Sequence, residues 1–344
     1  MSAIPLGFAS PPAWRPLLRF LRRRLLQVVP VVFGIALLNF LILQAAPGDI
    51  VDVLAGEAGA ATPEYMAQLR ESFGLNLPLW VQFKNYMVSV LTLDLGWSFR
   101  QNIPVFDLVM DRVPATLLLM GAAIAFALAF GVVLGVLSSL KAHGWLDEVL
   151  SVLVLISYAM PTFWLGLMAV VLFSARLGWL PSGGMVDLGA DHTGLALAWD
   201  VARHALLPAL TLSTFYLAVY AKLVRTAMLE LHGADFIRTA RAKGAGEWRI
   251  TLVHALRNAL LPLVTMVGYQ VASLLSGAVL VESVFNWPGI GRLAFEAVMA
   301  RDFNLLLGIL LLSSILVTLI NVLVDLLYAW LDPRVKLSGG GGGA

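Results

Sequence analysis

The chain has 344 residues, of which 60% are hydrophobic and only 13% are charged, and its formal net charge is +2. Soluble domains are about 45–50% apolar and about 25% charged, so this composition excludes an ordinary soluble protein and indicates several membrane spans. The small net charge gives no reason to expect a nucleic-acid partner. The absence of cysteine excludes disulfides, thiolate metal sites and a cysteine nucleophile.

Six apolar segments are long enough to cross a bilayer, which takes about 20 residues of helix. The first is longer than the apolar region of a cleaved signal peptide, so it is treated as a span. Pro161 in the third and Pro208 near the start of the fourth predict kinks. We therefore predict an all-α polytopic membrane protein with six transmembrane helices near residues 25–46, 115–140, 149–175, 204–224, 261–282 and 304–331.

The distribution of lysine and arginine predicts the orientation. If the basic tail at residues 1–24 is cytoplasmic, 15 of these residues lie on the cytoplasmic side and 8 on the other, mostly in one long loop. Both termini are then cytoplasmic. Residues 337–344 end in a glycine run and are interpreted as a linker remnant.

Two loops are then external. Residues 47–113 form a large loop with amphipathic helices at 62–73 and 77–91, the first of them started by Thr62, Pro63 and Glu64. Residues 176–203 form a second loop that carries three aspartates. None of the 5 histidines stands in a ligand spacing such as H-E-x-x-H, so the sequence predicts no metal site.

The internal loop at residues 225–260 is basic and contains two predicted helices. FIRTARAK is followed by a glycine break and then by EWRITLVHALRNALL. Gly244 suits a helix C-terminal cap, and Glu247 suits the first turn of the next helix. A plain solvated loop is the alternative. Ordered helices with few Pro or Ser residues favour a rigid docking element.

RTARAKG (238–244) followed by HALRNALLP (254–262) resembles the cytoplasmic coupling loop of ABC-importer permeases of the dipeptide/oligopeptide branch. Importer permeases generally carry Glu-Ala-Ala followed by Gly. Here Arg238, Thr239 and Ala240 stand at those positions, and the leading Glu is missing, as is usual in the peptide branch. Further matches extend the resemblance over roughly residues 19–336, namely PGD (47–49), DLGWS (94–98), ATL (115–117), FNWPGIGRL (285–293) and DLLYAWLDPRVK (325–336).

The resemblance implies an ABC-importer permease fold in the bacterial inner membrane, with residues 114–336 as the permease core. Such a chain pairs with a second homologous permease, two cytoplasmic ATPase subunits or a fused equivalent, and an extracytoplasmic solute-binding protein. It binds no cofactor, because ATP and Mg are used by the ATPase subunits. This agrees with the lack of a G-x-x-x-x-G-K-[ST] motif, so no enzymatic activity is predicted for this chain. Di- or oligopeptides are the default solute, although relatives carry glutathione, nickel chelates or haem.

The resemblance also implies that a short helix in the internal loop inserts into a groove of an ATPase subunit and moves the spans. Its basic residues would pair with acidic groups, and its small residues would allow close approach. The predicted coupling set is Asp235, Arg238, Thr239, Ala240, Arg241, Ala242, Lys243 and Gly244.

Polar residues on the inner faces of spans are candidates for the translocation pathway, because lipid-facing polar groups are costly. Gln270, Ser273 and Ser276 share one face, although helix packing through small residues is the alternative. Asp325 has Asn321 one turn away, although it could be interfacial or paired with Arg334.

Two more candidates follow the fifth span. Glu282 is expected to contact a substrate amine or the binding protein, or simply to end a helix in water. The FNWPGIG turn is expected to form an external gate or a docking contact, with an interfacial aromatic anchor as the alternative. Its residues are Phe285, Asn286, Trp287, Pro288, Gly289 and Gly291.

Two other functions fit the sequence less well. A stand-alone secondary transporter or channel predicts inverted repeats and charges near the midplane, and neither is clear here. A membrane enzyme needs a catalytic constellation, and no catalytic residue is predicted.

Overall fold

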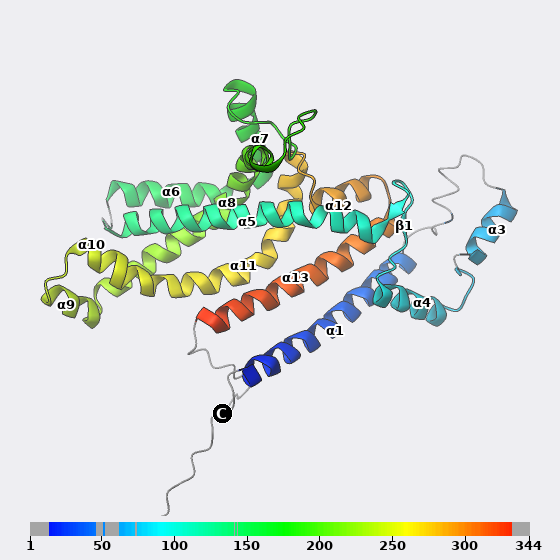
Figure 1. Cartoon of the computed structure of the whole chain (residues 1–344), viewed down its shortest axis with the longest axis horizontal. Helices are drawn as coiled ribbons and strands as arrows, with labels where there is room; N and C mark the ends of the chain where they lie inside the picture. The colour runs from blue at the N-terminus through cyan, green and yellow to red at the C-terminus, as the bar shows by residue number, and fades with distance from the viewer. Residues whose placement is uncertain are drawn as a thin grey trace, which may run out of the picture. The chain divides into compact units, whose positions relative to one another are not determined.

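A computed structural model describes residues 14–45, 51, 62–72, 74–140, 142 and 144–331, and these are almost entirely helical (Figure 1). The PGD motif, Arg334 and the glycine run lie outside the described residues. In chain order the elements are α1 (Trp14–Ala45), α3 (Pro63–Ser72), α4 (Leu79–Thr92), β1 (Trp97–Ser98), β2 (Ile103–Pro104), α5 (Val105–Leu140), α6 (Trp145–Ala159), α7 (Thr162–Ala169), η1 (Val170–Arg176), α8 (Gly194–His232), α9 (Asp235–Ala242), α10 (Glu247–Arg249), η2 (Ile250–Ala255), α11 (Leu256–Val284), α12 (Ile290–Met299) and α13 (Phe303–Leu331).

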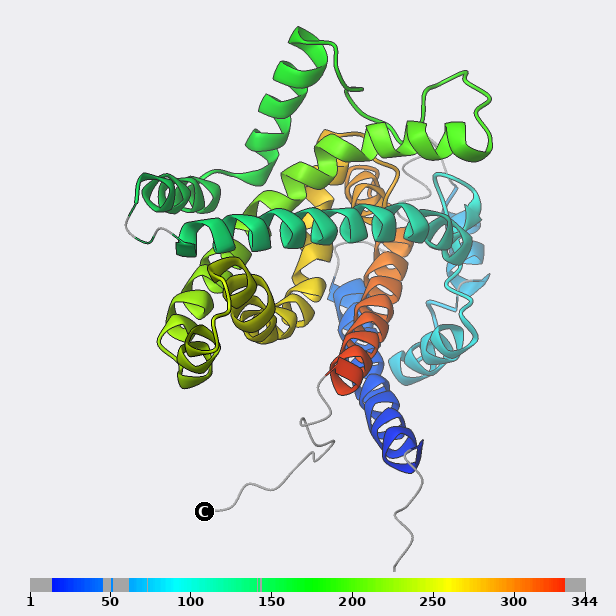
Figure 2. The same cartoon turned by 60° about the vertical axis from the view of Figure 1, so that its left-hand side comes forward.

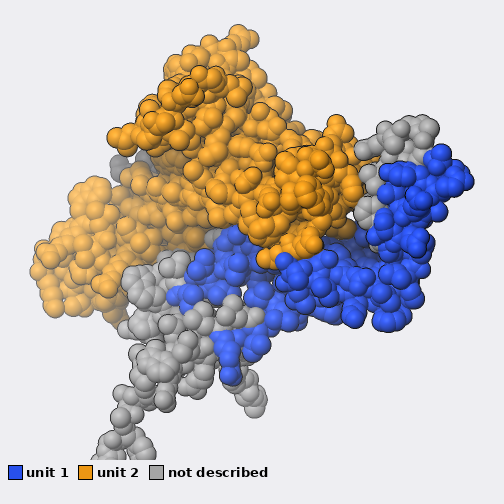
Figure 3. Space-filling model, turned by 45° about the vertical axis from the view of Figure 1, so that its right-hand side comes forward, with its two compact units in different colours: residues 1–92, 314–344 blue, residues 93–313 orange. Residues whose placement is uncertain are grey.

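The chain divides into two compact units, residues 1–92 with 314–344 and residues 93–313 (Figure 3). In the first unit α1 packs against α4 through aromatic rings. The ring of Phe40 lies 5.2 Å from that of Phe83 and 6.1 Å from that of Tyr86, measured between centroids. Only 17% of the most apolar window of α1 is buried. A helix that leaves so much apolar surface exposed is suited to lipid.

The core of the second unit is the pair formed by α5 and α8. A Cβ added at Gly131 would lie 2.8 Å from Cβ of Tyr220, and one at Gly135 would lie 2.7 Å from the carbonyl oxygen of Ala221. The two glycines form a G-x-x-x-G pattern, which lets helix backbones approach closely where lipid gives no hydrophobic driving force. α8 continues through Pro208, where the sequence predicted a kink.

The predicted third span is sharply bent. α6 ends at Ala159, α7 starts at Thr162, and the two halves meet at 107° (Figure 2). Met160 is extended, with ψ of 130°, because a residue before proline avoids the α conformation. The expected simple kink is therefore a break between two helices. The π-helical η1 completes the second half.

Four described helices are long and apolar enough to cross a membrane, α1, α5, α8 and α13, and the bent pair would make a fifth. α5 begins at Val105 and α8 at Gly194, so both helices start inside segments expected to be external loops. The all-α expectation is right apart from the short antiparallel pair β1–β2, in which Trp97 faces Pro104.

Candidate functional site

The predicted coupling segment is a short, protruding helix. α9 and α10 lie at the end of α8 and α11 that is away from α12 (Figure 1). Ile237 is fully buried and fixes α9 against η2, whereas the other seven residues of α9 are exposed or half-buried. Phe236 and Trp248 remain 42% and 67% exposed. Most of this segment therefore faces outward, including apolar surface that sequence reasoning did not single out.

The turn after α9 has the geometry of a Schellman cap. Gly244 has φ of +80°, its N–H donates to the carbonyl of Arg241 at 3.0 Å, and the N–H of Ala245 donates to the carbonyl of Ala240 at 3.2 Å. The predicted cap is confirmed. A residue with a side chain is strained at this φ, so glycine sets the angle between α9 and α10.

An ion pair closes the same turn. Arg241 donates from Nε to Oε1 of Glu247 at 2.9 Å and from Nη2 to Oε2 at 3.1 Å. The guanidinium of Arg241 lowers the pKa of Glu247, chiefly through this hydrogen bond. Arg238 lies 3.8 Å from Asp235. The charge of Arg241 is thus paired within the chain. Lys243 is an exposed cation in the described part of the coupling segment.

A buried hydrogen-bond network around Glu282 joins α5, α11 and α12 at the other end of the second unit. Glu282 is 0% exposed, and its Oε1 accepts a hydrogen bond from the hydroxyl of Thr116 at 2.8 Å. Its Oε2 accepts from the N–H of Arg292 at 3.1 Å, and Thr116 accepts from the N–H of Ile290 at 2.8 Å. These donors belong to the first turn of α12, whose N-cap, Gly289, provides no side chain. Glu282 therefore caps α12 from a neighbouring helix.

This burial corrects the expectation that Glu282 ends a helix in water. It is also why glycine stands at position 289. A Cβ there would overlap the Glu282 carboxyl group, and one at Gly291 would lie 2.5 Å from Cα of Val279. This hydrogen-bond network could not be predicted from the sequence, because Thr116 and Glu282 are 166 positions apart.

The aromatic residues of FNWPGIG are core residues. Trp287 is 0% exposed, and its Nε1 donates to the carbonyl of Ala115 at 2.9 Å. Phe285 is 1% exposed, and its carbonyl accepts from the N–H of Gly184 at 2.8 Å. The alternative of an interfacial aromatic anchor is therefore wrong. The exposed part of the turn is Asn286, which has φ of +52°.

The predicted pathway residues are distributed over both units. Gln270 is buried in α11, and Asn321 is exposed in the part of α13 that belongs to the first unit. The side chains of Ser273, Ser276 and Asp325 lie outside the described residues. The pathway set therefore stays a prediction.

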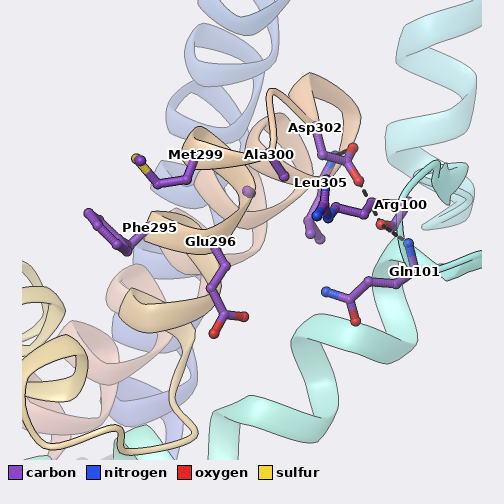
Figure 4. Close-up of a pocket in the computed structure, with 10 residues that line it drawn as sticks. Arg100, Gln101, Phe295, Glu296, Met299, Ala300, Asp302 and Leu305 are labelled. Atoms are coloured by element: carbon purple, nitrogen blue, oxygen red, sulfur yellow. Dashed lines mark hydrogen bonds between the residues drawn. The ribbon is translucent and has the colours of Figure 1, made fainter. Parts of the chain in front are cut away.

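A cavity of about 510 Å³ lies between the β1–β2 turn and α12 (Figure 4). Arg100 and Gln101 line it from the turn, and Glu296 lines it from α12. The hydroxyl of Ser98 donates to Oδ2 of Asp302 at 2.6 Å, while Oδ1 of Asp302 accepts the N–H of Leu305 at 3.1 Å. The DLGWS motif thus closes onto the N-cap of α13. Sequence reasoning recognised the motif but missed this cavity.

A partly buried ion pair connects three helices about ten residues before α9. Nη2 of Arg225 donates to Oδ2 of Asp147 at 2.6 Å, and the hydroxyl of Ser138 donates to Oδ1 at 2.6 Å. These residues come from α8, α6 and α5. In the sequence Arg225 was only counted as a cytoplasmic charge.

This arrangement is that of an ABC-importer permease. The structure is similar to a solved chain of the MetNI methionine ABC transporter in inward-facing conformations, with a TM-score of 0.53 and 21% sequence identity. The match covers 65% of this chain and 96% of that chain, and it concerns the fold alone.

The family follows from the sequence comparison. Residues 131–337 match the family described as binding-protein-dependent transport system inner membrane component. Residues 17–120 match the family described as binding-protein-dependent transport system membrane component, N-terminal. The chain belongs to this family of membrane permease components.

Its relatives include dipeptide permeases. It is 42% identical over 337 residues to the dipeptide transport system permease protein DppB of Escherichia coli K12, covering 93% of this chain and 99% of the relative. It is 40% identical to DppB of Alkalihalophilus pseudofirmus, covering 93% and 100%. It is also 40% identical to the di/tripeptide permease DppB of Pseudomonas aeruginosa, covering 93% and 99%.

Proposed function

We propose that this chain forms half of the translocation pathway of an ATP-driven importer of dipeptides or related small peptides. A second, homologous permease would form the other half. Two ATPase subunits or a fused equivalent would bind on the cytoplasmic side, where ATP and Mg are used, and a solute-binding protein would dock outside. Identities near 40% to dipeptide and di/tripeptide permeases along nearly the whole chain support this solute class.

The observation that carries the proposal is the exposed, rigidly capped α9. Its single buried residue, Ile237, anchors it to the bundle, Phe236 and Arg238 of α9 are exposed, and so is its C-cap residue Lys243. A short amphipathic helix of this kind suits a groove on an ATPase subunit. Rotation of that subunit would displace α9 and, through α8, the spans attached to it.

The proposed topology has six spans, α1, α5, the bent α6–η1 pair, α8, α11 and α13. α11 has 29 residues, or about 44 Å, which is long enough to cross a bilayer. Both termini would be cytoplasmic, which also places α9 on the ATPase side. The FNWPGIG turn and the 510 Å³ cavity would then face outside, where the binding protein docks.

For the pathway, Gln270, Ser273, Ser276, Asn321 and Asp325 remain our candidates. Asp325→Asn should lower the uptake rate if its carboxylate faces the pathway. An unchanged rate would remove it from the candidate set.

Gly244→Pro tests the coupling role. Proline cannot adopt φ of +80° and lacks the N–H that caps α9, so α9 should lose its angle to α10. Peptide uptake by membrane vesicles supplied with ATP should be abolished while the permease still inserts. Gly246→Ala is the matched control, because a Cβ at Gly246 meets no atom within 4 Å. Normal ATP-driven uptake by Gly244→Pro would overturn the proposal.

The subunit composition tests it independently. The chain should co-purify from its native membrane in mild detergent with a second permease and at least one P-loop ATPase, identified by mass spectrometry. A chain that is recovered alone in every mild detergent would contradict the importer function.

A further inference from the structure

Two aspartates and one histidine meet where the loop at 177–193 joins the first turns of α8, and a second histidine lies against both aspartates. One ligand atom each from Asp187, His192 and Asp200 lie within 4.8 Å of one another. His204 follows Asp200 by one helical turn, and its Nε2 lies 3.6 Å from Oδ1 of Asp187. The sequence did not reveal this cluster, because its spacing matches no ligand motif.

The imidazole of His204 is oriented by its surroundings. Its Nδ1 lies 2.9 Å from the carbonyl oxygen of Asp200 and 3.1 Å from Oδ1 of the same residue. Both are acceptors, so they favour the tautomer with the proton on Nδ1, in which Nε2 presents a lone pair. That lone pair faces the carboxylate of Asp187 at a separation too long for a hydrogen bond. Two electron-rich atoms in this position are suited to share a cation.

The burial of His204 and Asp200 also supports a bound cation. His204 is 5% exposed and Asp200 is 4% exposed. The rule that buried charges are normally paired or bound to metal applies here to the Asp200 carboxylate. Oδ2 of Asp200 accepts the N–H of Asp187 at 2.8 Å, so the loop and the helix are already held in register. A histidine that donates from one nitrogen to a backbone carbonyl and presents the other is the usual arrangement of a metal ligand.

We propose that Asp187, His192, Asp200 and His204 bind a divalent transition metal ion of the Zn²⁺ type. Two imidazole nitrogens and two carboxylate oxygens suit zinc, whereas Ca²⁺ and Mg²⁺ prefer oxygen ligands alone. Bonds of about 2.0–2.1 Å in a tetrahedral site place ligand atoms about 3.3 Å apart. The 3.6 Å between Asp187 and His204 is already close to this value.

The ion would have a structural role. The loop is fixed at a second point, where the N–H of Gly184 donates to the carbonyl of Phe285 in the FNWPGIG turn. Binding at Asp187 and His192 would hold the rest of the loop onto α8. It would therefore stabilise the folded chain in proportion to the logarithm of the free metal concentration.

The test uses the full-length chain in its complex, purified without a histidine tag and treated with chelator. Titration with ZnCl₂ against a competing chelating dye should give about one site per chain, and zinc should raise Tm. MgCl₂ should not compete. Asp187→Asn and His192→Ala change exposed side chains, so folding should survive, and each should lower zinc affinity by at least about 10-fold.

Asp191→Asn is the matched control, because Asp191 is exposed in the same loop and lies outside the cluster. It should bind zinc as the unaltered chain does. Absence of a stoichiometric site in the unaltered chain would overturn the proposal. Equal zinc affinity in Asp187→Asn, His192→Ala and the control would also overturn it, since the ion would then bind elsewhere.

Discussion

Two glutamates serve the starts of two short helices, and their surroundings differ in almost every respect. Glu282 is fully buried and accepts hydrogen bonds from Thr116 and from the first turn of α12. Glu247 stands in the first turn of α10, is exposed, and pairs with Arg241. A buried acceptor cannot be replaced by water when it is removed, whereas an exposed one can. A glutamate therefore stabilises the folded core at position 282, whereas at position 247 it fixes the geometry of a local turn.

Glu282→Leu should have the largest effect. It leaves the hydroxyl of Thr116 and the N–H of Arg292 buried without an acceptor, at a cost of about 3 kcal/mol or more. We expect little folded protein, measured by size exclusion in detergent after heating. Glu282→Gln should be intermediate, and exposed Glu296→Gln should match the unaltered chain. If Glu282→Leu lost transport at an unchanged Tm, Glu282 would be a pathway residue and not a cap.

Gly289→Ala should come next. The added Cβ would overlap the Glu282 carboxyl group, and such overpacking costs about 1–3 kcal/mol. Gly121→Ala in α5 is the control, because its Cβ meets no atom within 4 Å. Tm of the two variants should separate by several degrees, with Gly289→Ala the lower. Equal Tm values would mean that the hydrogen-bond network around Glu282 accommodates the added Cβ without a measurable loss of stability.

Trp287→Phe should have a moderate effect. It keeps most of the buried ring but loses the hydrogen bond from the indole N–H to the carbonyl of Ala115, at a cost of about 1 kcal/mol. Trp248→Phe makes the same change at an exposed position and should leave Tm unaltered. A Tm loss of the same size in both variants would show that the hydrogen bond contributes nothing.

Glu247→Gln should have the smallest effect on Tm, because the pair with Arg241 is exposed and screened by salt. Its effect should be confined to the turn, where the backbone amides of residues 243–246 should exchange hydrogen faster than in the unaltered chain. Since Arg241 lowers the pKa of Glu247, the pair contributes above the ordinary pKa of a glutamate and is lost as pH falls through the lowered value. The exchange difference between the variant and the unaltered chain should vanish over that range. If the difference in exchange rate persisted below that pH range, it would arise from a contact other than the Arg241–Glu247 pair.

Local chemistry made the helix and turn at residues 235–247 predictable. α9 ends at Ala242 and Gly244 takes the left-handed conformation, as the Gly-Ala-Gly break indicated. Long apolar runs likewise revealed the main helices. Helix starts were less predictable, because α5 and α8 extend beyond their apolar cores into polar segments. Glycine caps and hydrophobic runs act within a few residues, so a sequence displays them directly.

Contacts between distant segments could not be read in this way. Nothing near Glu282 in the sequence indicates that Thr116 is its partner. Tryptophan is a residue type common at membrane interfaces, yet Trp287 is buried. Pro161 predicted a kink but not a 107° break, since the extent of a bend depends on what packs around it. The cluster of Asp187, His192, Asp200 and His204 forms only because the loop folds back onto α8.

The continuity of α8 has a consequence for the two ends of the second unit. Its 39 residues run about 58 Å, with Asp200 and His204 near one end and α9 directly after the other. Gly131 and Gly135 of α5 contact its backbone, so α5 has little freedom to slide independently. An unbroken helix passes a displacement on without absorbing it. If an ATPase subunit binds α9 and a metal ion binds near Asp200, as proposed above, the two binding free energies are reciprocal. Whatever factor ATPase binding applies to the metal affinity, metal binding applies to the affinity for the ATPase.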